Sequence, residues 1–215
     1  MKIIEDFQAH ADTEKAKKQE AYLRNQFKFL GLSTPVRREL SKSFLKEKAE
    51  EKKIDWQLVD RLWSEEEREF QYLACDYLRK MKKYLKTTDL PQIYQLATIK
   101  SWWETVDSLD ELVGTLLLSG KIKSQDILNW SIDENFWIRR IAIDCQLGFK
   151  EATDTELLSS VIRNNLGSKE FFINKAIGWA LRDYSKTHPK WVAHFLSENE
   201  EKLANLSLRE ASKYL

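Results

Sequence analysis

Two tryptophans and an aspartate in this 215-residue sequence occupy positions that the packing of helices does not require. Trp103 and Asp107 are four residues apart, so a helix places an indole and a carboxylate on one face, one turn apart. Trp179 lies off the apolar stripe of its own segment, among basic residues. Indole faces and carboxylates both attract cations, so this set could bind and stabilise a positively charged group. A solvated Asp107 and a Trp179 packed on a neighbouring helix are the alternative interpretations.

Apolar stripes indicate which faces of these segments are buried. In 100–118 the stripe has three-to-four spacing and consists of Trp102, Val106, Leu109, Val113 and Leu116. In 169–186 it consists of Ile173, Ala176, Ile177, Ala180, Leu181 and Tyr184. In the segment from Phe136, the inward residues are Ile138, Ile141 and Cys145. Arg140 then falls at the boundary of the buried face, where Asp144, one turn later, could pair with it.

Several cations lie off the apolar faces and are candidate contacts for a polyanion. They are Arg37, Arg38, Lys175, Arg182 and Lys186. Each is more typical of a solvated residue on a helix. Asp107, in contrast, has no local ion partner, because no basic residue occurs between Glu104 and Gly120.

Composition excludes several classes of protein. The 35 Lys and Arg residues nearly balance the 34 Asp and Glu residues, which gives a net charge of +1. The chain therefore lacks the strong basicity of a typical nucleic-acid-binding module. The six isolated glycines rule out a glycine-rich phosphate loop. The two cysteines lie in apolar helical patterns, which indicates buried thiols, and no His or Cys spacing suits a metal. With no signal peptide or membrane-spanning stretch, we expect a cytoplasmic protein without metal or cofactor.

Periodicity and the scarcity of Gly and Pro predict an all-α protein. The expected helices cover 12–29, 35–48, 56–62, 65–81, 89–100, 102–119, 124–129, 136–147, 154–164, 169–186, 190–198 and 200–206. Similar triplets at 74–76, 142–144 and 176–178 are 68 and 34 residues apart, which favours stacked helix pairs. Such pairs form a curved α-solenoid, an α-α superhelix with a concave groove lined by the second helices. A generic helical bundle is the alternative fold.

The solenoid would bring the candidate residues together. Asp107, Arg140 and Trp179 come from three successive inner helices, with separations of 33 and 39 residues. Trp103 shares the helix of Asp107, so all four side chains could line one groove.

Four segments resemble the HEAT-like-repeat alkylpurine DNA glycosylases. They are 100–107 (KSWWETVD), 137–140 (WIRR), 171–184 (FFINKAIGWALRDY) and 22–40, which contains FLG at 29–31 and TPVRR at 34–38. The resemblance covers nearly the whole chain in the family's order. It implies a single glycosylase domain over 1–215, a curved solenoid that holds double-stranded DNA in its concave face. The implied reaction is base excision of N3- or N7-alkylated purines without base flipping, which leaves an abasic site.

The resemblance also implies roles for individual residues. Trp103, Asp107 and Trp179 match the catalytic cleft, Arg140 matches an arginine that contacts DNA, and Tyr22 matches an aromatic residue that lines the cleft. Members of the family that bind DNA tend to be basic, and this chain is not. Residues 1–100 include 21 basic and 17 acidic residues, whereas residues 101–215 include 14 basic and 17 acidic residues. DNA binding would therefore depend on a local stripe of Arg and Lys and weaken steeply with salt.

The residue types suit this chemistry. An N3- or N7-alkylated purine is cationic, so it is a good leaving group that needs no general acid. Asp107 would stabilise the oxocarbenium-like sugar and orient or deprotonate the attacking water. Trp103 and Trp179 would surround the deoxyribose, while Arg140 would hold a phosphate. No lysine is placed as a Schiff-base nucleophile, so we expect a monofunctional hydrolase without lyase activity.

Two other function classes remain open on the sequence. The chain could be a non-catalytic binder of damaged or unusual DNA structures, or a helical-repeat module for protein–protein interaction. For the glycosylase we expect a monomer that acts on double-stranded DNA containing alkylated bases, with no membrane and no obligate protein partner.

Overall fold

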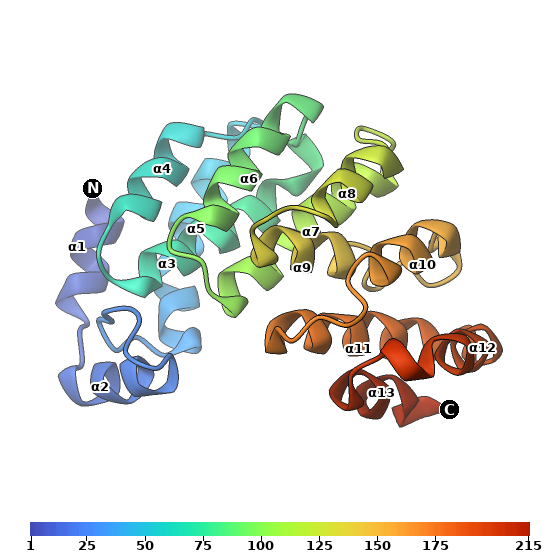
Figure 1. Cartoon of the computed structure of the whole chain (residues 1–215). Coiled ribbons are helices and arrows are strands. Elements are labelled where there is room, and N and C mark those ends of the chain that lie inside the picture. Colours follow the sequence, from blue (N-terminus) through green and yellow to red (C-terminus); the bar gives the residue numbers. More distant parts are fainter. The chain divides into compact units, whose positions relative to one another are not determined.

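The computed structural model describes all residues from Met1 to Leu215 and contains helices but no strands (Figure 1). Thirteen α-helices are joined by turns and by five short 3-10 helices. This confirms the predicted all-α class. No helix has the length and apolar character needed to cross a membrane. The chain divides into two compact units, 1–85 and 86–215, which are described separately.

The first unit contains five α-helices. They are α1 (Lys2–Ala9), α2 (Thr13–Tyr22), α3 (Thr34–Glu50), α4 (Trp56–Ser64) and α5 (Arg68–Met81). Helix α5 packs against α3 and α4, and α1 packs against α3. Phe7 of α1 stacks on Phe70 of α5, with 5.7 Å between the ring centroids, and both rings are fully buried. Apolar burial of this kind holds the unit together.

The beginning of the chain differs from the prediction in two ways. Helix α1 was not predicted, because its apolar face consists of only Ile3, Ile4 and Phe7, too few residues to establish a period. The helix predicted over 12–29 ends at Tyr22. Arg24 and Asn25 adopt left-handed backbone angles, with φ of 56° and 55°, and a helix cannot continue through them.

The loop after this break is held by a buried carboxylate. Glu69 accepts hydrogen bonds from the backbone N–H groups of Leu30, Gly31 and Leu32, at 3.0, 2.9 and 3.0 Å. Gly31 has φ of +91°, and a Cβ atom there would lie 2.0 Å from the carbonyl oxygen of Asp12. Only glycine fits this position, so the sequence Phe-Leu-Gly fixes the path of the loop.

The second unit contains the remaining helices. They are α6 (Leu90–Thr98), α7 (Trp103–Leu118), α8 (Ser124–Trp130), α9 (Phe136–Asp144), α10 (Thr155–Arg163), α11 (Phe171–Ser185), α12 (Pro189–Asn199) and α13 (Asn205–Ala211). Helix α7 packs against α9, and α9 packs against α11. The second helices of successive pairs are therefore neighbours, as stacked helical repeats require.

The predicted core stripes of the second unit are largely confirmed. Val106, Leu109, Val113 and Leu116 of α7 are buried, as are the six predicted positions of α11 and the three predicted positions in α9 and directly after it. Trp102 is only partly buried. Both cysteines are buried free thiols, as predicted. The helix predicted over 200–206 is wrong: a 3-10 turn covers Glu200–Lys202, the backbone is extended at Leu203 and Ala204, and α13 begins at Asn205.

Gly114 sets the distance between the two helices that carry Asp107 and Arg140. A Cβ atom at Gly114 would lie 2.2 Å from the carbonyl oxygen of Cys145. We therefore expect Gly114→Ala to push α7 away from α9 and to lower the free energy of unfolding by about 1 to 3 kcal/mol, as measured by urea unfolding. Leu118→Ala, at a 60% exposed position of the same helix, is the control and should cost much less. Equal unfolding midpoints for the two variants would contradict this close approach.

Candidate active site

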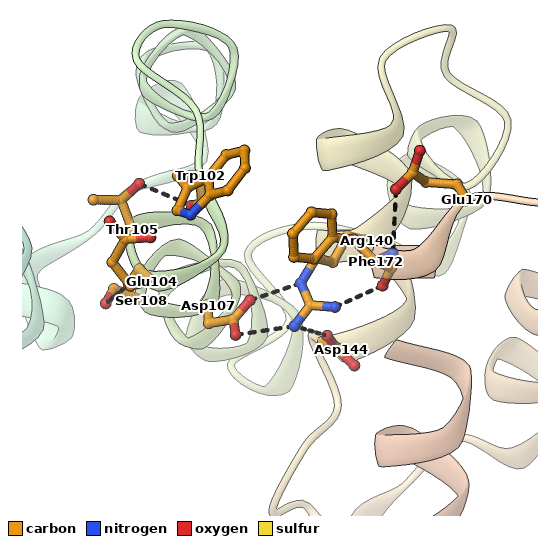
Figure 2. A network of polar contacts seen from close by, with 9 residues as sticks. All are labelled: Trp102, Glu104, Thr105, Asp107, Ser108, Arg140, Asp144, Glu170 and Phe172. Carbon is orange, nitrogen blue, oxygen red and sulfur yellow. Dashed lines mark hydrogen bonds and ion pairs between the residues drawn. The ribbon is translucent and has the colours of Figure 1, made fainter. Parts of the chain in front are cut away.

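An ion pair joins α7 to α9 (Figure 2). The guanidinium of Arg140 donates from Nε to Oδ1 of Asp107 at 2.7 Å and from Nη2 to Oδ2 at 2.9 Å. Its Nη1 donates to the backbone carbonyl of Phe172 at 2.7 Å. Arg140 is 1% exposed, whereas the side chain of Asp107 is 22% exposed. A planar guanidinium thus fixes both oxygens of a carboxylate that solvent still reaches.

The structure adds to the prediction for both residues. Asp107 has no ion partner within its own helix, but it has one 33 residues away. Arg140, expected at the boundary of the buried face, is inside it. Its predicted pairing with Asp144 is confirmed, with 3.6 Å between Nη2 and Oδ2. A phosphate contact by Arg140 stays a prediction, while its visible role is to hold Asp107 and the beginning of α11.

Two further carboxylates lie beside this pair. Oxygen atoms of Asp107, Asp110 and Asp144 all lie within 4.8 Å of one another, a grouping of the kind that can hold a metal ion. Here the guanidinium of Arg140 already places a positive charge among them. Burial raises the pKa of the Asp107 carboxyl above its ordinary value, although the hydrogen bonds and charge of Arg140 oppose this shift.

Sequence reasoning did not select Asp110 as a site residue. The available signal was its position on α7, next to Leu109 and one turn before Val113, where an acid interrupts buried apolar residues. A buried acid with no basic residue nearby in sequence requires a partner from another element.

The two predicted tryptophans are partly exposed, as expected for residues off the core stripes. Trp103 begins α7, one turn before Asp107. The ring centroid of Trp179 lies 5.1 Å from Cζ of Arg140 and 5.6 Å from Nζ of Lys175. The structure therefore brings Asp107, Arg140 and Trp179 together from three helices, and Trp103 shares the helix of Asp107.

Aromatic rings pack together where α7, α9 and α11 begin. The ring centroids of Trp102 and Phe172 are 5.5 Å apart, and those of Trp137 and Phe172 are 4.8 Å apart. Trp102 and Trp137 also contact each other, at 6.0 Å. Because Phe172 also supplies the carbonyl that Arg140 binds, this cluster fixes the guanidinium relative to all three helices.

The predicted DNA contacts on α11 are bound within the protein. Lys175 and Arg182 pair with Glu210 of α13, at 2.9 and 2.7 Å, and the carboxylate of Glu210 is buried. Lys186 pairs with Asp183 at 2.9 Å and is exposed. The contacts of these three cations with DNA stay predictions, and the structure shows that two of them attach α13 to α11.

We expect the ion pairs of Glu210 to contribute to stability. Hydrogen bonds from Lys213 and Lys175 lower the pKa of its carboxyl from 4.5 to about 2. Because the pKa is lower in the folded state, Glu210 stabilises the fold at pH values above the pKa of the unfolded chain. This stabilisation is lost as the pH falls from about 4.5 to about 2. Glu210→Gln should therefore lower the free energy of unfolding by roughly 1 to 2 kcal/mol at pH 7, which corresponds to a melting temperature several degrees lower. The difference in melting temperature between variant and wild type should shrink below pH 4. Glu198→Gln, which removes an exposed pair with Arg163, is the control, and an equal effect of both changes would contradict this assignment.

The other predicted DNA contacts lie in the first unit. Tyr22 is the last residue of α2 and is 73% exposed. Arg37 is 8% exposed, pairs with Asp76 at 3.0 Å and lies over the ring of Tyr72. Arg38, the next residue, is exposed. Of these two arginines, only Arg38 presents its side chain openly to solvent.

Comparison with known proteins gives a consistent result. The sequence profile of a family described as DNA alkylation repair enzyme matches residues 3–215. A solved structure described as a predicted DNA alkylation repair enzyme from Enterococcus faecalis matches with a TM-score of 0.87 and 36% sequence identity, over 95% of this chain and 96% of that chain. No curated protein matches this chain.

Proposed function

Because the chain belongs to the DNA alkylation repair enzyme family, we propose that it is a monofunctional DNA glycosylase for N3- or N7-alkylated purines. The proposed substrate is double-stranded DNA containing the alkylated base, and the product is an abasic site. The observation that carries the proposal is the geometry of Asp107, a partly exposed carboxylate whose two oxygens are fixed by Arg140 near the Trp179 ring.

The reaction requires negative charge close to the sugar. Alkylation makes the purine cationic, so the base leaves without a proton donor and the positive charge develops on the deoxyribose. Each oxygen of Asp107 accepts one hydrogen bond from Arg140 and keeps a second lone pair. Asp107 uses this capacity to stabilise the oxocarbenium-like sugar and to orient or deprotonate the attacking water.

Arg140 acts on the reaction through Asp107. Its charge and two hydrogen bonds favour the ionised carboxylate and so oppose the effect of burial, which raises the pKa of Asp107. The contact with Phe172 holds the guanidinium in place, so the carboxylate is positioned before the DNA arrives. In this role Arg140 is a positioning residue.

Trp103 and Trp179 contribute aromatic faces next to the carboxylate. An indole face attracts a cationic group by about 0.5 to 2 kcal/mol, depending on its exposure to water. Trp179 already has two cations within 6 Å of its ring, which supports its capacity for such contacts. The two indoles bind the deoxyribose of the alkylated nucleotide and exclude water from the cationic intermediate.

Binding of the DNA backbone depends on local charge, because the chain carries a net charge of only +1. The exposed cations Arg38 and Lys186 contact phosphates, and Tyr22 contacts the duplex through its exposed ring. Few phosphate contacts give weak binding that is lost as salt is added. The protein acts as a monomer, without a cofactor.

The proposal is tested with purified protein and methylated duplex DNA. We expect release of free 7-methylguanine or 3-methyladenine, with a strand that breaks only after alkali treatment. DNA affinity that falls with salt, without any released base, would instead show a non-catalytic binder. No DNA affinity at any salt concentration would favour a module for protein–protein interaction.

A further inference from the structure

Two aspartates that the proposed reaction does not use lie behind the site. Asp110 of α7 is 7% exposed and Asp144 of α9 is 1% exposed. Asp110 follows Asp107 by three residues and Asp144 follows Arg140 by four, so each lies one helical turn from a site residue. Their oxygens and those of Asp107 lie within 4.8 Å of one another. We call Asp110 and Asp144 the carboxyl pair.

The guanidinium of Arg140 lies closer to the carboxylate of Asp107 than to that of Asp144. Its Nη2 lies 2.9 Å from Oδ2 of Asp107 but 3.6 Å from Oδ2 of Asp144, which is too long for a hydrogen bond (Figure 2). Both oxygens of Asp144 are buried without a hydrogen-bond partner. A buried carboxylate is strongly disfavoured as an anion when nothing donates to it. This geometry suits a neutral Asp144.

The charged groups that face the carboxyl pair are few. Asp107 comes from α7 and Arg140 from α9. The buried thiol of Cys145, which directly follows α9, stays protonated because burial raises its pKa. Lys175 of α11 pairs with Glu210. Helices α6, α8 and α10 also pack against α9, and their buried residues are apolar.

Charge balance then favours a proton on the carboxyl pair. If all three aspartates were ionised, three negative charges would face the one positive charge of Arg140 inside the protein. Asp107 receives both short hydrogen bonds and is partly exposed, so it stays ionised and the proton lies on the carboxyl pair. Burial raises the pKa of Asp110 and Asp144, that of Asp144 to about 7. Carboxyl groups placed together in this way titrate as a unit.

We propose that Asp110 and Asp144 are positioning residues that share a proton, and that this proton keeps the guanidinium of Arg140 on Asp107. When the proton is lost to solvent, ionised Asp144 competes for Nη2 and weakens the hold on Asp107. The effect on base release rests on the proposed glycosylase function, whereas the sharing of the proton does not. The expected result is a rate of base release that falls as the pH rises through neutrality.

The shared proton is tested first without DNA. In protein labelled with ¹³C at the aspartate carboxyl carbons, we expect NMR signals of the carboxyl pair to titrate near neutral pH. Asp144→Asn should remove this titration, and so should Asp110→Asn if the first variant does not fold. Asp60→Asn, at an exposed position of α4, is the control and should leave it unchanged. Carboxyl signals that are all ionised from pH 5 upward would overturn the proposal.

The effect on Asp107 is tested by single-turnover base release between pH 6 and pH 9. Asparagine is neutral at every pH, so Asp144→Asn should match the wild type near pH 6 and exceed it by about tenfold one pH unit above the pKa of the pair. The ratio of the two rates cancels the substrate's own pH dependence. Parallel pH profiles would overturn the positioning role. If the wild type releases no base at any pH, the proposed function fails, and the NMR titration alone decides whether the proton is shared.

Discussion

Replacing Asp107 with asparagine is expected to slow base release by about 100-fold or more, because the sugar cation loses the negative charge that faces it. Asparagine keeps the shape of the side chain but can neither carry the charge nor accept a proton from water. Single-turnover release from methylated duplex DNA measures the effect. A variant that retained more than a tenth of the wild-type rate would show that Asp107 is not the catalytic carboxylate.

The same variant should still fold and bind DNA. With Asp107 neutral, Arg140 still has Asp144 and Asp110 beside it, so no unpaired cation is buried. We expect its melting temperature and its DNA affinity to remain close to those of the wild type. Asp60→Asn is the control for both measurements, since it removes an exposed aspartate of α4. If Asp107→Asn failed to fold while Asp60→Asn folded normally, the ion pair of Asp107 with Arg140 would have a structural role.

Replacing Arg140 with glutamine is expected to lower the free energy of unfolding by about 3 to 5 kcal/mol, because it leaves neighbouring buried carboxylates without their cation. It also removes the donors to Asp107 and Phe172. Urea unfolding measures the loss. Arg139→Gln is the matched control, since Arg139 is partly exposed and donates only to backbone carbonyls of Asp133 and Glu134.

The loss caused by Arg140→Gln should depend on pH in one direction. Without the guanidinium, the pKa of the buried carboxyls rises further above the unfolded value, so the folded state binds more protons than the unfolded state. Stability must then fall as the pH rises from about 4 towards 8. Adding Asp144→Asn should recover part of the stability at pH 8. An equally small effect of Arg140→Gln and Arg139→Gln at every pH would contradict the buried network.

Local sequence patterns predicted most of the helices and the faces that they bury. The stripe from Val106 to Leu116 and the six core positions of α11 were predicted from spacing alone. Spacing also placed Trp103 and Asp107 on one helix and left Trp179 partly exposed. The local errors arose where short segments or left-handed residues decide the structure, as in α1 and at Arg24.

The polar partners that lie on different helices could not be predicted, because they are set by the packing of those helices. Asp107 and Arg140 are 33 residues apart, and Lys175 and Glu210 are 35 apart. No local pattern states which cation meets which carboxylate across such separations. The carboxyl pair depends on the register of α7 against α9, which Gly114 sets by its contact with the backbone of Cys145.

The most direct test of the central claim is single-turnover release of base from a duplex that carries one defined lesion, either 7-methylguanine or 3-methyladenine. The wild type should release the free base faster than the uncatalysed reaction and leave an unbroken strand with an abasic site, while Asp107→Asn should approach the uncatalysed rate. Release of base at equal rates by both proteins, or by neither, would contradict the account.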